Sequence, residues 1–215
     1  MAEQVLVVGL GRFGAAVARE LESLGHEVLG VDADEATVNE IAPELTHALQ
    51  LDARDEVALR AAGAPDFEIA VVAISSDAEA SIFATTVLKN LGVGHVVSKA
   101  GSRLHGDILA RIGADRVVFP EREMGVQVAR SISQPNVLEY LEVGPGYGVE
   151  RMRVPGTWVG RTVGELDLAG RHGVRPLLLR RGRDVLASLA ASQRLEAGDE
   201  IVVAGPDTKL AKLRG

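Results

Sequence analysis

A glycine-rich turn near the start of the chain constrains the fold more than any other feature. Val5–Val8 predicts a buried strand, the hexapeptide Gly-Leu-Gly-Arg-Phe-Gly follows at positions 9–14, and a helical pattern extends over Arg12–Leu24. A second apolar run, Glu27–Val31, ends at Asp32, which lies 23 positions after the first glycine. Strand, glycine turn, helix, strand and an acid about 20 residues on form the dinucleotide-binding fingerprint. The sequence therefore predicts a Rossmann-like domain that binds a nucleotide.

The residues of this turn have separate physical roles. Gly9 permits a tight turn, Gly11 lets the backbone approach a phosphate, and Gly14 lets the helix pack closely against the strand. The N–H groups of the first helical turn then face the anion. Asp32 can accept hydrogen bonds from the two ribose hydroxyls, although an acid here could instead cap the next helix. Asp34 can supply that cap, which favours the ribose role for Asp32.

The composition narrows the class of protein. The 215 residues carry a net charge of −7, so there is no overall basic surplus to replace the counterions of a nucleic acid, and we expect no nucleic-acid partner. The absence of cysteine excludes disulfides, thiol catalysis and cysteine-ligated metals. No apolar run approaches the ~20 residues that span a bilayer. We expect a cytoplasmic protein that acts at a membrane only through a partner.

The first 135 residues alternate between strand and helix patterns, which predicts an α/β fold with a doubly wound parallel sheet. Strands are expected at Val5–Val8, Glu27–Val31, Ala48–Leu51, Ile69–Ile74, His95–Ser98 and Arg116–Phe119. Helices are expected at Arg12–Leu24, Glu35–Ile41, Glu56–Ala62, Ala78–Leu91, Arg103–Ile112 and Glu123–Ser133. Residues 1–135 are thus predicted to form one nucleotide-binding domain.

The pattern changes at Pro135, which should end the preceding helix. Residues 136–215 consist mainly of strand and turn signals and predict a small α+β lobe. Its strands are expected at Val137–Val143, Gly148–Val154, Arg175–Arg181 and Glu200–Ala204, and its helices at Thr162–His172 and Asp207–Leu213. Thr162 stands three residues before Glu165, the spacing of a capping box.

An NAD-dependent oxidoreductase is the default interpretation of a glycine turn alone, but this lobe offers little for proton transfer. Such an enzyme needs a substrate domain with an acid–base residue. The only histidine after residue 135 is His172, before Gly173 at the end of a predicted helix, where it would interact with the helix dipole. Asp199 and Asp207 lie beside glycine or proline and Asp184 lies two residues after Gly182, so all three are interpreted as turn residues.

A set of motifs along the chain resembles one family, the RCK (KTN/TrkA-N plus TrkA-C) regulatory subunits of Ktr/Trk potassium-uptake systems. In the first domain the motifs are the glycine turn with Arg12, Asp32, Leu51-Asp52-Ala53, Ser98-Lys99-Ala100 and Gly113–Glu121. In the second lobe they are Gly160–Leu168 and Ala197–Gly205. The resemblance covers essentially the whole chain and implies a nucleotide-binding RCK domain followed by a TrkA-C lobe.

The resemblance also implies partners. One copy of the two-lobe unit is similar to the Ktr type, in which homodimers assemble into an octameric ring beneath an integral membrane potassium-transporting subunit of the KtrB/TrkH type. We therefore expect peripheral attachment to the inner face of the cell membrane. Some Ktr regulators bind cyclic di-AMP through an arginine and a proline in the second lobe. This chain has Ala169 at the first position, although Arg171 is near, and no proline in Ser188–Ala191, which argues against cyclic di-AMP.

Arg12 is the first candidate for a phosphate contact. Its guanidinium follows the glycine turn and can reach the terminal phosphates of a nucleotide, and in similar proteins this arginine senses the γ-phosphate. A cation at a helix N-terminus opposes the dipole, so an anionic ligand would explain its position. Phe13 belongs to the same turn. The resemblance places adenine against Asp52 and the Ala53 backbone, although Asp52 could equally be an ordinary loop acid.

The remaining candidates lie at the ends of later strands. Ile74 and Ser75 lie at the end of strand four and should lie over the nucleotide, and Lys99 ends strand five on the same sheet edge, where it could contact a phosphate. Glu121 follows strand six. The resemblance places it near the γ-phosphate, where it would coordinate Mg²⁺, Ca²⁺ or Na⁺; a carboxylate favoured by the helix dipole is the simpler alternative.

These expectations describe a gating subunit rather than an enzyme. ATP would engage Arg12, Lys99 and Glu121 across a dimer and ADP would not, which would shift the ring between two conformations. NAD(H) is the alternative ligand, because Asp32 suits any adenosine ribose with a free 2′-hydroxyl. The alternatives in function are an NAD-dependent oxidoreductase and a redox or nucleotide sensor of another transporter.

Overall fold

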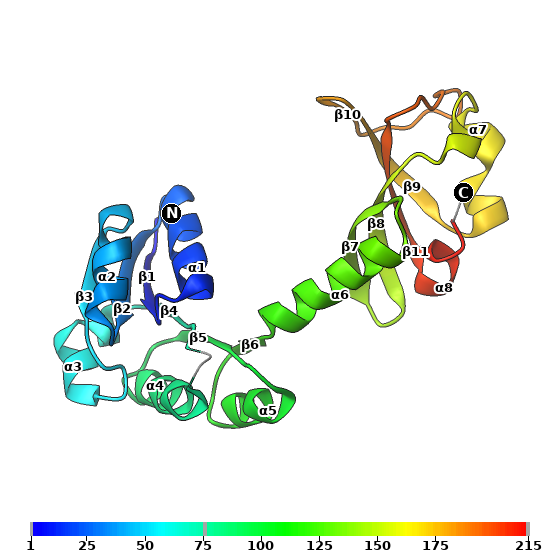
Figure 1. Ribbon diagram of the computed structural model, residues 1–215. Helices are drawn as coiled ribbons and strands as arrows, with labels where there is room; N and C mark the ends of the chain where they lie inside the picture. The colour runs from blue at the N-terminus through cyan, green and yellow to red at the C-terminus, as the bar shows by residue number, and fades with distance from the viewer. Residues whose placement is uncertain (1, 75–76, 214–215) are drawn as a thin grey trace. The chain divides into compact units, whose positions relative to one another are not determined.

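Two compact units make up the chain. The computed structural model describes residues 2–74 and 77–213, with the backbone alone for residue 130. Contacts divide the chain into Met1–Glu121, the first unit, and Arg122–Gly215, the second unit (Figure 1). The division falls near the start of the helix Pro120–Ser133. The sequence predicts the boundary at residue 135, close to the end of this helix.

The first unit is a Rossmann-like parallel sheet with strand order β3-β2-β1-β4-β5-β6, as the sequence predicts. Its strands are β1 (Gln4–Val8), β2 (Glu27–Asp32), β3 (His47–Gln50), β4 (Ile69–Val72), β5 (His95–Lys99) and β6 (Arg116–Val118). Its helices are α1 (Arg12–Ser23), α2 (Glu35–Ile41), α3 (Glu56–Ala61), α4 (Ala78–Asn90) and α5 (Arg103–Arg111), with short 3-10 turns at Ala42–Glu44 and Ala64–Asp66.

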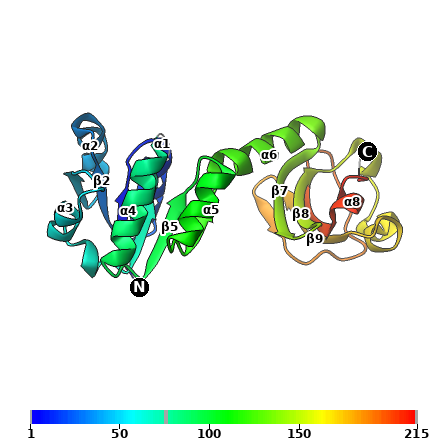
Figure 2. The ribbon, with the colours of Figure 1, turned by 90° about the horizontal axis from the view of Figure 1, so that it is seen from below.

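Side-chain alternation along the strands divides the core of this unit between the two faces of the sheet. Val5 and Val7 of β1 pack with Ala15 and Ala18 of α1 and with residues of α2. The intervening Leu6 and Val8 pack on the other face with residues of α3 and α4. Helices cover both faces of the sheet (Figure 2). Because successive strand residues point to opposite faces, nearly every residue of β1 must be apolar.

The second unit is built on an antiparallel sheet with strand order β10-β9-β11-β8-β7. Its strands are β7 (Val137–Gly144), β8 (Tyr147–Arg153), β9 (Arg175–Arg181), β10 (Asp184–Leu186) and β11 (Glu200–Pro206). Its short helices are α7 (Val163–Leu166), α8 (Asp207–Leu210), a 3-10 turn at Gly156–Trp158 and a π-helical turn at Leu168–His172. Buried residues of the sheet, such as Met152 and Ile201, pack with Trp158, Leu166 and Leu210.

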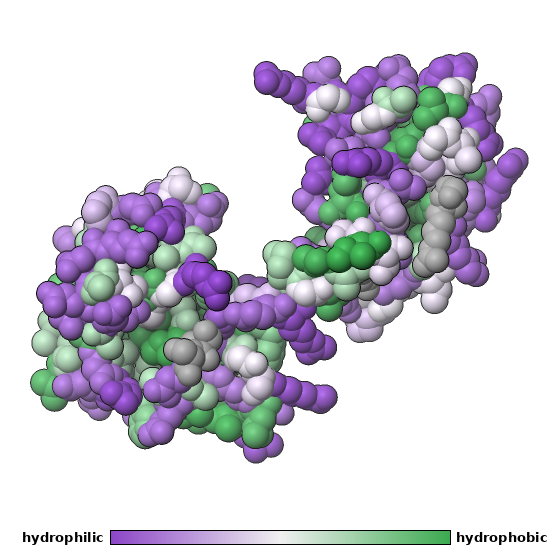
Figure 3. Space-filling view, viewed as in Figure 1, coloured by the Kyte–Doolittle hydropathy of each residue, from purple (hydrophilic) through white to green (hydrophobic). Residues whose placement is uncertain are grey.

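Helix α6 (Pro120–Ser133) begins earlier than expected, at Pro120 rather than Glu123. Proline suits a first helical turn, because its missing N–H would have no partner there and its φ is already helical. Met124, Val128 and Ile132 are spaced four residues apart and leave 57%, 49% and 74% of their surface exposed. Hydrophobic side chains gather over α6 on the face seen in Figure 3. This apolar stripe therefore leaves about half or more of each side chain open to solvent.

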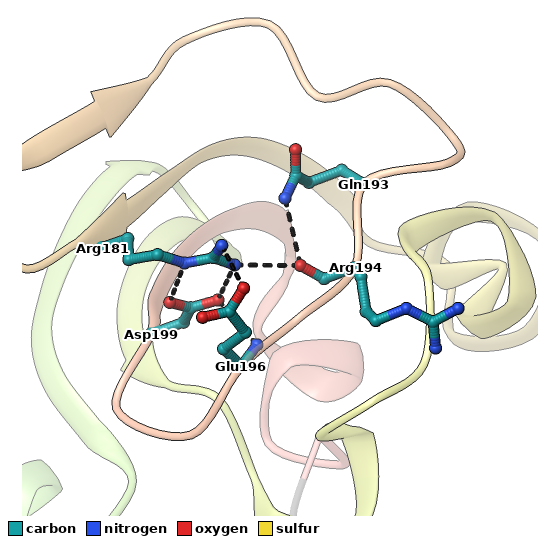
Figure 4. Close-up of polar contacts among 5 residues, drawn as sticks. All are labelled: Arg181, Gln193, Arg194, Glu196 and Asp199. Atoms are coloured by element: carbon teal, nitrogen blue, oxygen red, sulfur yellow. Dashed lines mark hydrogen bonds and ion pairs between the residues drawn. The ribbon is translucent and has the colours of Figure 1, made fainter.

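An ion-pair network holds one edge of the second unit (Figure 4). Arg181 at the end of β9 donates from Nε and Nη2 to the two carboxylate oxygens of Asp199, each at 2.8 Å, and also pairs with Glu196. Asp199 is 1% exposed, and Arg181 lowers the pKa of this carboxyl group. Asp199 ends a turn, as its neighbours in the sequence predict, because its N–H donates to the Glu196 carbonyl oxygen at 3.2 Å. What the sequence does not predict is that this acid is buried and has a dedicated cationic partner.

Further elements differ from the sequence predictions, including α8, which ends at Leu210 rather than at Leu213. The helix expected over Thr162–His172 is wrong as a single helix, because Asp167 adopts a left-handed conformation (φ 46°) that separates α7 from the π-helical turn. The capping box of Thr162 and Glu165 is confirmed at the start of α7. Strand β10 was not predicted, and β4 ends at Val72 rather than at Ile74. Within the described residues, no helix is both long and apolar enough to cross a bilayer.

Candidate functional site

The glycine turn between β1 and α1 has the conformation that its sequence predicts. Gly9 has φ +90° and donates its N–H to the Val31 carbonyl oxygen at 2.8 Å, which ties the turn to β2. A Cβ on Gly14 would lie 1.8 Å from the Gly9 carbonyl oxygen, so only glycine allows α1 to approach this closely. A Cβ on Gly11 would meet no described atom within 4 Å. The space beside Gly11 is therefore open to a ligand.

The N-terminus of α1 differs from those of its neighbours. In the first unit, α2, α3, α4 and α5 each begin at a residue whose side chain accepts a backbone N–H of the first turn; these residues are Asp34, Asp55, Asp77 and Ser102. The residue before α1 is Gly11, so this helix has no side-chain cap among the described residues, and no acid occupies its first turn. Its first-turn N–H groups are thus left without a side-chain acceptor among the described residues, as in helices that bind phosphate.

Asp32 is fixed beside this turn by backbone groups. Its Oδ2 accepts the Leu10 N–H at 2.7 Å, and its Oδ1 accepts the Asp34 N–H at 2.9 Å. Asp34 caps α2 through Ala36 and Thr37, so the cap does not require Asp32, as the sequence indicated. Each carboxylate oxygen of Asp32 keeps a further lone pair for an external donor. The acid is therefore oriented before any ligand arrives.

A pocket of about 310 Å³ joins these features. It extends along the carboxyl ends of β1, β2, β3 and β4 and is lined by Val8, Gly9, Gly11, Asp32, Ala33, Leu51, Asp52, Ala53, Arg54, Ala73, Ile74, Asp77 and Ala80. Six of the residues predicted from the sequence meet here: Gly9, Gly11, Asp32, Asp52, Ala53 and Ile74. Ser75, which was predicted to join them, lies outside the described residues.

Arg54 lines this pocket but was missed by the sequence analysis. Its guanidinium pairs with the Asp52 carboxylate, with Nε at 3.0 Å from both oxygens and Nη2 at 2.6 Å from Oδ2. The hydrogen bond and charge of Arg54 lower the pKa of Asp52, and Asp52 raises the pKa of Arg54. The sequence does contain one indication of this role for Arg54. It stands two positions after Asp52 in the loop that follows a strand, so both side chains can reach the same pocket.

Arg12 lies on another side of the glycine turn. It is exposed and lines a second hollow, of about 300 Å³, together with Leu10, Gly11, Ala15, Arg19, Thr37, Glu40 and Ile41. Gly11 lines both hollows. A group bound at Gly11 in the first pocket would therefore lie beside the hollow that holds the Arg12 side chain.

Lys99 and Glu121 form a separate group, away from the described lining of the first pocket. Lys99 Nζ lies 2.6 Å from Glu121 Oε1 and 5.3 Å from the centre of the Phe13 ring, and the lysine is 4% exposed. The Lys99 hydrogen bond lowers the pKa of Glu121, and the charge of Arg12 lowers it further. The Phe13 ring thus lies near the Lys99 ammonium group. Phe13 is not among the described residues that line the first pocket. Because Glu121 keeps 69% of its side chain exposed, a further ligand can reach it.

The described residues contain no cluster of three or more histidine, cysteine, aspartate or glutamate side chains suited to a metal ion. Glu121 alone supplies one carboxylate, whereas Ca²⁺ takes six to eight oxygen ligands. A cation at Glu121 would need further oxygens from a nucleotide or from another subunit.

Comparisons with known proteins assign both units to known domain types. The TrkA-N domain model matches residues 5–120, and the TrkA-C domain model matches residues 149–215. The chain is 38% identical over 209 residues to Ktr system potassium uptake protein A of Vibrio alginolyticus, covering 97% of this chain and 95% of that protein. It is 35% identical over 212 residues to Ktr system potassium uptake protein C of Bacillus subtilis (strain 168), covering 99% and 96%.

Solved structures share the fold. The GsuK channel superposes with a TM-score of 0.72 at 17% identity, covering 100% of this chain and 40% of that one. A GsuK channel bound to NAD has a TM-score of 0.52 at 22% identity and covers 97% and 37%. A GsuK structure bound to ADP has a TM-score of 0.54 at 16% identity and covers 62% and 36%. At these identities the likeness establishes the fold.

Proposed function

The chain belongs to the family of Ktr potassium-uptake proteins with a TrkA-N and a TrkA-C domain, and we propose that it is a regulatory subunit that gates a membrane potassium transporter in response to a bound adenine nucleotide. It would work at the cytoplasmic face of the membrane through an integral membrane potassium-transporting subunit. Its role is to bind and to change conformation rather than to catalyse a reaction.

The observation that carries this proposal is the pocket at the glycine turn. An uncapped helix N-terminus, an open position beside Gly11 and a pre-oriented acid at Asp32 lie along one pocket. The first two features suit a phosphate and the third suits a ribose. Their order along the sheet edge matches the order of the same groups in a nucleotide.

The difference between ATP and ADP would come from the charged groups beyond the pocket. Arg12 lies beside Gly11, and its charge influences Glu121, which in turn pairs with Lys99. A γ-phosphate is the group that distinguishes ATP, and it would compete with Glu121 for Lys99 and attract Arg12. Glu121 also lies in the first turn of α6, so a change at Glu121 can alter how that helix begins.

A differential effect on two conformations is required for gating. A nucleotide shifts a conformational equilibrium only by the difference between its affinities for the two states. ADP would occupy the base and ribose parts of the pocket without engaging Arg12 and Lys99. ATP would therefore favour a different state of the assembly.

The apolar stripe on α6 is suited to a second copy of the chain. Met124, Val128 and Ile132 form one exposed face, and their burial between two copies would remove apolar surface from water. A homodimer formed in this way would be the unit from which an octameric ring assembles. A dimer could also bring a second nucleotide close to Glu121, with Mg²⁺, Ca²⁺ or Na⁺ held between the carboxylate and the phosphates.

NAD(H) is the second candidate ligand, and Asp32 is the observation that favours it. A carboxylate at this position accepts hydrogen bonds from a free ribose diol and repels a 2′-phosphate, so it suits NAD(H) as well as ATP and ADP. An oxidoreductase would turn over NADH in the presence of a substrate. We expect the purified protein to bind without turnover.

Calorimetric titration with ATP, ADP and NADH, each with and without Mg²⁺, tests the proposal. We expect adenine nucleotides to bind tightly, and Arg12→Ala to weaken ATP binding more than ADP binding. Arg19→Ala is the matched control, because Arg19 lines the same hollow on α1 but pairs with Glu44. Strong NADH binding with weak ATP binding would instead support redox sensing, and NADH turnover would support an oxidoreductase.

A further inference from the structure

Arg54 occupies the part of the pocket that the phosphate and ribose do not use. The glycine turn lies at β1 and Asp32 at β2, so the third wall, at the end of β3, remains for the base. Leu51, Asp52, Ala53 and Arg54 make up this wall. It includes apolar surface from Leu51 and Ala53, with a single guanidinium beside it.

Asp52 fixes the plane of this guanidinium. The Arg54 side chain makes three contacts of 2.6–3.0 Å with the carboxylate, and the Arg54 backbone N–H donates to Asp52 Oδ1 at 2.9 Å. Asp52 is thereby locked in a tight turn, and the guanidinium is held parallel to the carboxylate. Over half of the Arg54 side chain, 53%, remains accessible. A planar group is thus pre-oriented and open at the edge of the pocket.

We propose that Arg54 is the base-stacking residue of the nucleotide site: its guanidinium face, held by Asp52, covers one face of a purine base. The inference rests on the proposed nucleotide function and adds to it the residue that recognises the base. Guanidinium groups stack on aromatic rings because they are planar, delocalised and weakly hydrated. Base stacking does not depend on hydrogen-bond readout, so this contact would contribute affinity to adenine and to other purines.

The charges around Arg54 argue against a phosphate contact for this residue. Asp52 pairs with it directly, and Asp77 and Glu79 are close enough for their charges to raise its pKa. Three carboxylates around one guanidinium leave no net positive charge to attract a phosphate. A neutral base is therefore the ligand group that fits this wall.

Arg54→Ala and Arg54→Lys test the inference by calorimetry with ATP, ADP and AMP. Loss of the stacked guanidinium should lower the affinity for all three nucleotides by the same factor, about 5- to 20-fold, because all three carry the same base. Lysine keeps the charge but lacks the planar fork, so Arg54→Lys should lose nearly as much as Arg54→Ala. Arg60→Ala on α3 is the matched control, because Arg60 pairs with Glu56 and lies outside the described lining of the pocket.

Two results would overturn the inference. Full affinity in Arg54→Lys would show that charge, not stacking, matters at this position. Unchanged affinity in both variants would show that Arg54 does not contact the base. These failures are distinct from a failure of the proposed function, in which the wild-type protein itself would not bind adenine nucleotides. Thermal melting of each variant separates a loss of binding from a loss of folding.

Discussion

Asp32→Asn should weaken the binding of every nucleotide that carries a ribose diol. It should also remove the preference for such nucleotides over their 2′-deoxy forms. In the wild-type protein the carboxylate accepts two backbone N–H groups, from Leu10 at 2.7 Å and from Asp34 at 2.9 Å. An asparagine has one acceptor oxygen, so its amide group must oppose one of these two donors. The charge that strengthens the ribose hydrogen bonds is lost as well.

The size of the effect follows from the number of hydrogen bonds. Hydrogen bonds to a charged group contribute about 1.5–3 kcal/mol each, and losing one contact to the ribose corresponds to roughly 10- to 100-fold in affinity. The unmatched backbone donor adds a cost of about 1–3 kcal/mol to folding, because Asp32 is only partly exposed. Binding and stability should therefore both decline, and they should be measured separately by calorimetry and by chemical unfolding.

Comparison of ATP with 2′-deoxyATP isolates the ribose contact. Wild-type protein should prefer ATP, and Asp32→Asn should bind the two ligands about equally. Asp34→Asn is the control in the same loop: it also loses one acceptor oxygen, toward Ala36 or Thr37, so its stability should decline, but Asp34 lies outside the described lining of the pocket and the variant should keep the wild-type preference for ATP. If Asp32→Asn still prefers ATP as strongly as wild type does, the role assigned to Asp32 is wrong.

Three further predictions concern folding and assembly. Gly14→Ala should lower the melting temperature because its Cβ would overlap a backbone carbonyl, whereas Gly11→Ala should keep the wild-type melting temperature and lose phosphate binding; equal melting of both variants would contradict this. Arg181→Ala should lower the free energy of unfolding measured in urea, because it leaves the buried Asp199 carboxylate without its cation. The pair lowers the pKa of Asp199, so its stabilisation is present above the ordinary aspartate pKa and declines as pH falls through the folded-state pKa; Arg181→Ala should lose this acid dependence, and an unchanged profile would refute it. Ile132→Glu should reduce dimerisation in sedimentation, and a fully dimeric variant would exclude the α6 stripe as the interface.

Local backbone requirements explain why the glycine turn could be predicted in detail. A positive φ at Gly9 and the close approach at Gly14 can be satisfied only by glycine, so the residue type itself reports the geometry. The position of Asp32 follows from the length of one strand–helix–strand unit. These features depend on residues close together in the chain, and the structure reproduces them.

Features that depend on distant residues were predicted less well. Asp199 has the local environment of a turn residue, and its partner Arg181 lies 18 positions earlier, so no local pattern indicates that the acid is buried. The break at Asp167 has a different cause. The helical pattern continues across it, but the Asp167 side chain accepts the Gly170 N–H and stabilises the left-handed conformation. A non-glycine residue in that conformation is uncommon and has little signature in the sequence.

The candidate site divides for a reason visible in the strand order. The expectation that Lys99 joins Asp32 rests on both residues ending strands of one parallel sheet. Lys99 ends β5, however, and β4 lies between β5 and β1 in the sheet. A shared edge is a line of strand ends rather than a single point, so residues at the ends of β2 and β5, with β1 and β4 between them, can line different parts of it. The sequence predicts the edge, whereas the strand order determines which residues meet.

This division suggests how affinity and response are separated in the molecule. Asp32 is held by backbone groups and Asp52 by Arg54, so their positions are set before a ligand binds, whichever nucleotide it is. Arg12 and Glu121 are exposed and can change partners when a phosphate arrives. Substitutions of Asp32, Asp52 or Arg54 should therefore lower the affinities for ATP and ADP by the same factor. Substitutions of Arg12 or Glu121 should change the ratio of the affinities for ATP and ADP. A difference between the two ligands in the conformation they favour depends on such selective contacts.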